Sequence, residues 1–212
     1  MHITVFGASG QVGKRIVHQA LNRGFTVTAF GRNVEDLIDE DHRNEQLIAL
    51  KGYIFNSKEV AAALNDSDAV IAALGGATDG SDKSRSLGIK TIIEQMQVKG
   101  IKRIVALGGT GVLWNNDNQY LIDSPDYPED AIPLGLEHLK SLELLQQSNL
   151  NWTLFCPGII IEEGETGNYS TNANHLPVIN KFRINEGDLA LAMLTAISKD
   201  EFIQQRVGIS KN

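Results

Sequence analysis

The sequence predicts an α/β fold in which a doubly wound, mostly parallel sheet is covered by helices on both faces. Short apolar segments alternate with helical segments along most of the chain. The central apolar segments contain almost no charge, which is typical of parallel strands that are buried on both faces. A chain of 212 residues also has the size of one domain. We therefore expect a single domain that spans residues 1–212.

The amino-terminal half begins with a strand at residues 2–6. The segment 12–21 follows, with apolar residues three and four positions apart, which indicates a helix with one buried face. Gly24 is a normal stop for this helix. The other elements predicted in this half are strands at 25–30, 52–55 and 69–74, and helices at 58–64 and 86–98.

The carboxyl-terminal half continues the alternation. Its predicted elements are strands at 103–107 and 152–156, and helices at 136–147 and 185–197. Asn185 or Asp188 is the expected cap of the last helix.

Two irregular segments, at about 110–133 and 157–185, interrupt this half. Both follow the carboxyl ends of predicted strands, where open α/β sheets bind ligands. We expect them to form the walls and lid of a substrate pocket. The alternative is that they are long surface loops.

A glycine-rich loop follows the first strand with the spacing G-x-x-G-x-x-G. The first glycine allows the sharp turn, the second lets the backbone approach a phosphate, and the third lets the helix pack closely. The helix that starts here directs its free N–H groups at an anion. Because the loop lies within a strand–loop–helix–strand unit, it predicts a Rossmann fold that binds a dinucleotide. The residues expected to hold it are Gly7, Ala8, Ser9, Gly10, Gln11, Val12 and Gly13.

The end of the second strand indicates which dinucleotide is bound. NAD-selective sites usually have an Asp or Glu there, which accepts hydrogen bonds from the ribose hydroxyls. Gly31 and Arg32 take this place, and Glu35 and Asp36 come too late in the sequence. An arginine can pair with a 2′-phosphate, so we predict NADP(H). The alternative is that Arg32 is a solvated surface residue.

Composition excludes several other classes. The net charge of −7 argues against nucleic acid as a partner. No stretch approaches the ~20 apolar residues of a membrane helix, and we find no signal peptide. Cys156 is the single cysteine and cannot form an internal disulfide, and no histidines pair at metal-ligand spacing. We expect a cytoplasmic monomer or homodimer that binds a small-molecule substrate and no metal.

Seven segments of the chain form a recognisable set: FGASGQVGKRIV, FGRN, SDAVIAALGG, GIKRIVALGG, LEHLKSLELLQQSNLNWTLFCPG, GETGNYS and NEGDLALAML. These segments resemble the atypical short-chain dehydrogenase/reductases, and among them the NAD(P)H-binding branch with flavin reductases and biliverdin reductase-like proteins. The resemblance covers essentially the whole chain and is more specific for fold and cofactor than for reaction.

The resemblance implies further site residues by position. His138 lies where the reductases have a histidine that approaches the cofactor. Three positions depart from the family. Tyr53 replaces an Asp that bonds adenine, Gly109 lies at or near a pocket Ser, and Gly158 replaces a second pocket His. The additional cofactor contacts expected from the resemblance are Tyr53, Ile54, Leu74, Gly75 and Gly76.

The Tyr and Lys pair of the main short-chain dehydrogenases is missing, because no tyrosine is followed by Lys four residues later. Our catalytic candidates are Thr110, which could donate a hydrogen bond to substrate or nicotinamide, and His138. The alternatives are loop packing for Thr110 and a surface position for His138. We expect Trp114, Pro157 and Gly158 to contact substrate, although Trp114 could equally seal the core.

These observations favour an NADP(H)-dependent oxidoreductase that transfers hydride to a small acceptor such as a flavin or a quinone. The alternative is a non-catalytic NADP(H)-binding redox sensor or regulator, which the missing polar groups would suit. An epimerase would need a proton-transfer residue that we do not find in the sequence.

Overall fold

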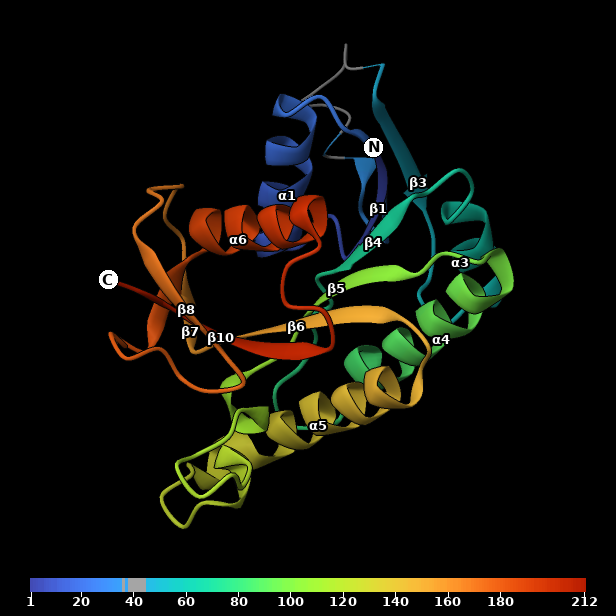
Figure 1. Ribbon diagram of the computed structural model, residues 1–212. Coiled ribbons are helices and arrows are strands. Elements are labelled where there is room, and N and C mark those ends of the chain that lie inside the picture. Colours follow the sequence, from blue (N-terminus) through green and yellow to red (C-terminus); the bar gives the residue numbers. More distant parts are fainter. Residues whose placement is uncertain (36, 38–44) are drawn as a thin grey trace.

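The computed structural model describes residues 1–35, 37 and 45–212 (Figure 1). Asp36, considered above at the end of the second strand, lies outside the described residues. An eight-stranded sheet forms the centre of the molecule. All neighbouring strands are parallel except β8, which is antiparallel to β10. The strands in spatial order are β3 (Leu47–Lys51), β2 (Thr26–Gly31), β1 (His2–Phe6), β4 (Ala69–Ala72), β5 (Arg103–Leu107), β6 (Asn151–Pro157), β10 (Gln205–Lys211) and β8 (Tyr169–Ala173). The predicted mostly parallel α/β sheet is confirmed.

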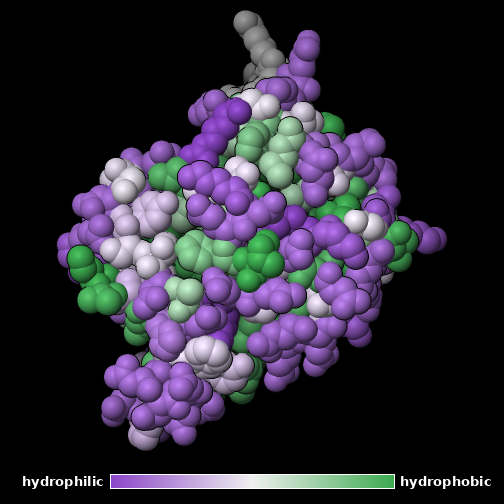
Figure 2. Space-filling model, viewed as in Figure 1, coloured by the Kyte–Doolittle hydropathy of each residue, from purple (hydrophilic) through white to green (hydrophobic). Residues whose placement is uncertain are grey.

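Helices cover both faces of this sheet (Figure 1). One apolar cluster joins α1 (Gln11–Asn22) and α6 (Glu186–Lys199) to the first face. A second cluster joins α3 (Ser57–Ala63), α4 (Ser84–Lys99) and α5 (Ile132–Gln147) to the opposite face. The face of the molecule seen in Figure 2 is mostly hydrophilic, with apolar residues in small patches. Among the described residues, no helix is long and apolar enough to cross a membrane.

The order of the strands places a crevice beside β1. The chain builds β2 and β3 on one side of β1, then crosses back and builds β4, β5 and β6 on the other side. This reversal is the position at which open α/β sheets bind ligands, outside the carboxyl ends of the strands. The glycine loop follows β1, and residues 73–76 follow β4, so both segments reach this crevice.

The third strand was predicted wrongly. The structure places β3 at Leu47–Lys51, and residues 52–55 form the turn after it. The backbone N–H of Asn56 donates to the Tyr53 carbonyl at 2.9 Å, and the Asn56 side chain caps α3. Because β3 is an edge strand with partly exposed side chains, it lacks the buried apolar run by which we identified the central strands.

The last part of the chain contains elements that the sequence analysis missed. These are β8 and β10 of the main sheet, and a separate parallel pair of β7 (Ile159–Ile161) and β9 (Arg183–Asn185). α6 begins at Glu186, and neither expected capping side chain bonds to its first turn. The Asp188 carboxylate instead accepts hydrogen bonds from the backbone N–H groups of Thr166 and Gly167, both at 2.7 Å. This residue therefore holds the long loop of the second irregular segment.

Candidate active site

The glycine loop packs tightly against the end of β4. Gly7 has a φ of +78°, and a Cβ there would collide with the carbonyl oxygen of Ala73. A Cβ at Gly13 would collide with the carbonyl oxygen of Gly7. Neither position can therefore accept a side chain, which agrees with the roles that the sequence pattern assigns to these glycines.

The start of α1 is open to an anion. Gly10 occupies the capping position, so no side chain satisfies the N–H groups of the first turn, and this turn contains no acidic residue. Gly10 itself has an ordinary backbone conformation, with φ −77° and ψ 168°. The unsatisfied N–H groups and the positive end of the helix dipole together favour a phosphate at this point.

A cavity of about 410 Å³ lies beside the loop at the carboxyl end of β2, and we call it the β2 cavity. Arg32 is exposed at its rim and makes no hydrogen bond or ion pair with any residue that the structure describes. Glu35, by contrast, forms an ion pair with Lys51, with 2.8 Å between Oε1 and Nζ. The lining includes Gly7, Ser9, Gly10, Gly31, Arg32, Tyr53, Ile54, Leu74 and Gly75. Although Tyr53 and Ile54 lie in the turn after β3 and not in the strand itself, they remain at the expected edge of the sheet.

A second cavity, of about 550 Å³, lies at the carboxyl ends of β4, β5 and β6, and we call it the β5 cavity. Its volume is within the usual range of small-molecule sites. Gly10, Ala73, Leu74 and Gly75 line both cavities, so the two meet at the glycine loop. The other lining residues include Gln11, Val12, Gly76, Arg85, Leu107, Gly109, Thr110, Tyr127, Pro128, Leu134, His138, Pro157, Gly158, Ile159 and Phe182.

The structure places both catalytic candidates, Thr110 and His138, on the β5 cavity. His138 is only 8% exposed. The pKa of His138 is lowered to about 4, chiefly by burial and also by the Arg85 charge, while the Glu137 charge acts in the opposite direction. The imidazole is therefore uncharged at neutral pH. Glu137 points elsewhere and accepts a hydrogen bond from Ser86 at 2.6 Å, as expected for adjacent residues on a helix.

The packing around His138 accounts for one departure from the reductase pattern. A Cβ at Gly109 would collide with Nδ1 of the His138 imidazole and would lie 2.6 Å from Cε1. A serine at this position is therefore incompatible with the observed orientation of the ring. Gly158 is similarly restricted, because a Cβ there would lie 2.5 Å from the Phe182 carbonyl oxygen.

We expect the burial of His138 to make the protein less stable in mild acid. Above pH 6.5 this residue is neutral in both the folded and the unfolded chain. As the pH falls towards 4, the unfolded chain binds a proton that the folded protein does not bind. The free energy of unfolding should therefore decrease by up to about 3 kcal/mol over this interval.

Urea denaturation of the wild type and of His138→Gln at pH 7, 5.5 and 4 measures this contribution. The variant should lose less stability than the wild type between pH 6.5 and 4. Parallel pH dependences of the two proteins would show that the imidazole is not held in its neutral form.

Trp114, expected either to contact substrate or to seal the core, lines neither of the two cavities. The Arg206 guanidinium lies 4.0 Å from the centre of the Trp114 ring, and His175 makes an edge contact with it at 5.8 Å between ring centres. The backbone N–H of Trp114 donates to the Asn174 carbonyl at 2.8 Å. These contacts hold the indole against the segment after β8.

Sequence reasoning did not single out several other residues of the β5 cavity, among them Arg85, Tyr127 and Phe182. Arg85 belongs to the first turn of α4, one position before the predicted start of that helix. The Tyr127 hydroxyl lies close to Gly111, and burial raises the pKa of Tyr127. Phe182 comes from the loop before β9 and belongs to no motif. Tyr127 and Phe182 lie within the two irregular segments expected to form the pocket, whereas nothing in the sequence around Arg85 indicated a site.

Comparisons with known proteins agree with this geometry. The model of the family described as NAD(P)H-binding matches residues 7–200. The uncharacterised protein YwnB of Bacillus subtilis (strain 168) is 27% identical over 216 residues, which cover 99% of this chain and 98% of YwnB.

Solved structures show the same similarity. A candidate NADH-flavin reductase from Streptococcus pneumoniae TIGR4 superposes with a TM-score of 0.83 at 28% identity, over 100% of both chains. A candidate epimerase from Bacteroides thetaiotaomicron superposes with a TM-score of 0.82 at 29% identity, over 99% of this chain and 96% of the other.

Proposed function

The chain belongs to the NAD(P)H-binding family, and from this premise we propose that it is an NADP(H)-dependent reductase acting on a flat acceptor such as a flavin or a quinone. The observation that carries the proposal is the pair of cavities that meet at the glycine loop. One cavity suits the adenosine half of the cofactor. The other has room for the nicotinamide and an acceptor side by side.

The residues present fit such a cofactor. The uncapped start of α1 offers N–H groups to the pyrophosphate. Gly31 leaves space beside the ribose, and none of the described residues that line the β2 cavity is a carboxylate that would repel a 2′-phosphate. Arg32 at its rim can bind that phosphate through a charge-assisted pair of hydrogen bonds. We therefore propose a preference for NADP(H) over NAD(H).

The bound cofactor would supply the hydride, and the side chains of the β5 cavity would orient the acceptor. Leu107, Leu134, Ile159 and Phe182 form apolar walls that exclude water from the ring of the acceptor. Neutral donors are available at Thr110 and Tyr127. Because the pKa of His138 is about 4, the cavity offers no protonated imidazole at neutral pH. Acceptors that take their proton from water suit this site best.

The decisive experiment is NADPH oxidation against a panel of flavins and quinones. We expect turnover with at least one of these acceptors, and faster turnover with NADPH than with NADH. Tight NADPH binding without turnover would contradict the reductase and favour the redox sensor, which the missing polar groups at Gly109 and Gly158 would suit.

A further inference from the structure

A single charged side chain, that of Arg85, lines the β5 cavity among the residues that the structure describes. It is half-buried in the first turn of α4. Its Nη1 donates to the Ala77 carbonyl and its Nη2 to the Gly76 carbonyl, both at 3.0 Å. The guanidinium is therefore held in one orientation at the wall of a mainly apolar cavity.

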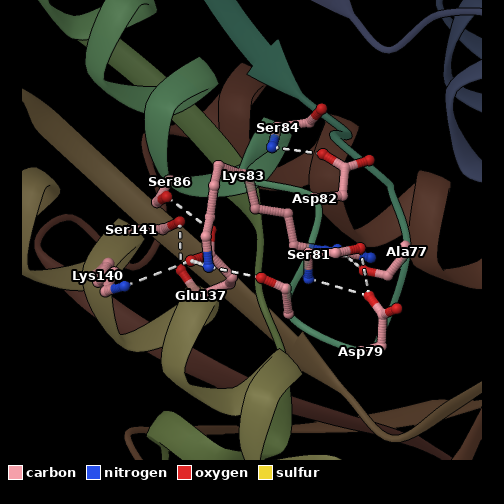
Figure 3. A network of polar contacts seen from close by, with 12 residues as sticks. Ala77, Asp79, Ser81, Asp82, Lys83, Ser84, Ser86, Glu137, Lys140 and Ser141 are labelled. Carbon is pink, nitrogen blue, oxygen red and sulfur yellow. Dashed lines mark hydrogen bonds and ion pairs between the residues drawn. The ribbon is translucent and has the colours of Figure 1, made fainter.

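A buried polar network fixes the turn that carries Arg85 (Figure 3). Glu137 of α5 is 1% exposed, accepts a hydrogen bond from Ser86 and forms an ion pair with Lys83 at 3.1 Å. Figure 3 also shows Lys140 approaching the same carboxylate, at 3.5 Å. Ser86 and Lys83 flank Arg85 in sequence, so the network ties the start of α4 to α5.

Among the residues that the structure describes, no carboxylate forms an ion pair with Arg85. The carboxylates that influence its pKa are those of Asp82 and Glu137, and neither forms an ion pair with it. Asp82 accepts a hydrogen bond from the backbone N–H of Ser84 at 2.7 Å, and Glu137 is occupied by the network described above. A guanidinium fixed by carbonyls alone retains N–H donors and a full charge for an anionic ligand.

The position of Arg85 points to the acceptor rather than the cofactor. Arg85 lines the β5 cavity but not the β2 cavity. The cofactor phosphates do not need this residue, because the N–H groups in the first turn of α1 can bind them. The charge of Arg85 also lowers the pKa of His138, which is one of the catalytic candidates. The guanidinium thus lies on the side of the site that we assign to the acceptor.

We propose that Arg85 recognises an anionic group on the acceptor, which is then an aromatic ring system carrying a phosphate or carboxylate. This inference rests on the proposed reductase function and specifies its substrate class. The apolar walls would hold the ring system, and Arg85 would bind its anionic substituent. An uncharged acceptor with the same rings would be bound more weakly.

Calorimetric titration of FMN and of riboflavin into the protein saturated with NADP⁺ tests this proposal. The two ligands share their rings and differ in one phosphate group. We expect FMN to bind at least about tenfold more tightly. In Arg85→Gln, the affinity for FMN should fall to that for riboflavin, while the affinities for riboflavin and NADPH stay unchanged. Arg85→Lys, which keeps the charge without the planar fork, should retain part of the preference for FMN.

Lys90→Gln is the matched control, because it removes one positive charge from an exposed position on the same helix. This variant should keep the full preference for FMN. Equal binding of the two flavins by the wild type, or no binding of either, would overturn the proposal. Loss of NADPH affinity in Arg85→Gln with the FMN preference intact would also overturn it, and would assign Arg85 to the cofactor phosphates. Turnover of NADPH with an uncharged quinone tests the reductase separately, since it does not depend on Arg85.

Discussion

Replacing Gly10 with valine should lower the affinity for NADPH by about 100-fold or more, with little change in stability. The φ of Gly10 is −77°, which any residue can adopt, and its added Cβ would meet only the Gly7 carbonyl oxygen, at 3.3 Å. The backbone conformation therefore allows a side chain, and the Gly7 carbonyl needs to shift by only a few tenths of an ångström to admit the Cβ. Because Gly10 lines both cavities, the valine would occupy the space in which the cofactor phosphates approach the first turn of α1.

Calorimetric titration with NADPH and thermal denaturation of the same preparations measure the two effects. Gly164→Val is the control, because a Cβ at this loop position meets no atom within 4 Å. It should retain both the affinity and the stability of the wild type. An unchanged NADPH affinity in a well-folded Gly10→Val protein would remove the glycine loop from the binding site.

Replacing Arg32 with alanine should weaken the binding of NADPH by about 10- to 100-fold and leave the binding of NADH unchanged. The two cofactors differ only in the 2′-phosphate, which Arg32 is free to bind at the rim of the β2 cavity. Arg23→Ala removes an equivalent positive charge at the opposite end of α1 and should affect neither cofactor. Equal losses for both cofactors, or no loss, would contradict the assignment of the 2′-phosphate to Arg32.

Most of the fold could be predicted because its central strands are buried on both faces. β4 is entirely apolar, and β1 and β5 are mostly apolar and buried, while the helix after β1 keeps one apolar face. β3 and β8 lie at the two edges of the sheet, where no residue is fully buried and this signal disappears. β10 is buried, but it was missed because Gly208 and Ser210 interrupt its apolar pattern.

The site was predictable where a motif determines backbone geometry. Tyr53, Ile54 and residues 74–76 line the two cavities as expected, and so do Gly7, Ser9, Gly10, Gln11 and Val12 of the glycine loop. Ala8 and Gly13, also expected to contact the cofactor, are buried and line neither cavity. The structure also places Thr110, Pro157 and Gly158 on the β5 cavity. The resemblance to NAD(P)H-binding proteins is confirmed at the level of the family.

Side chains that depend on tertiary packing could not be assigned from the sequence. His138 reaches the cavity because Gly109 leaves room for its ring. Trp114 does not line the cavity, because its indole packs against the guanidinium of Arg206 near the end of the chain. Arg85 belongs to no local pattern and becomes notable only because the cavity around it contains no other charge among the described residues.

The central claim is that the glycine loop binds NADP(H), and calorimetric titration of the wild-type protein with NADPH and with NADH tests it most directly. We predict one NADPH bound per chain, with an affinity at least about tenfold higher than that for NADH. Binding of neither nucleotide would mean that the loop has only a structural role, and would contradict the account.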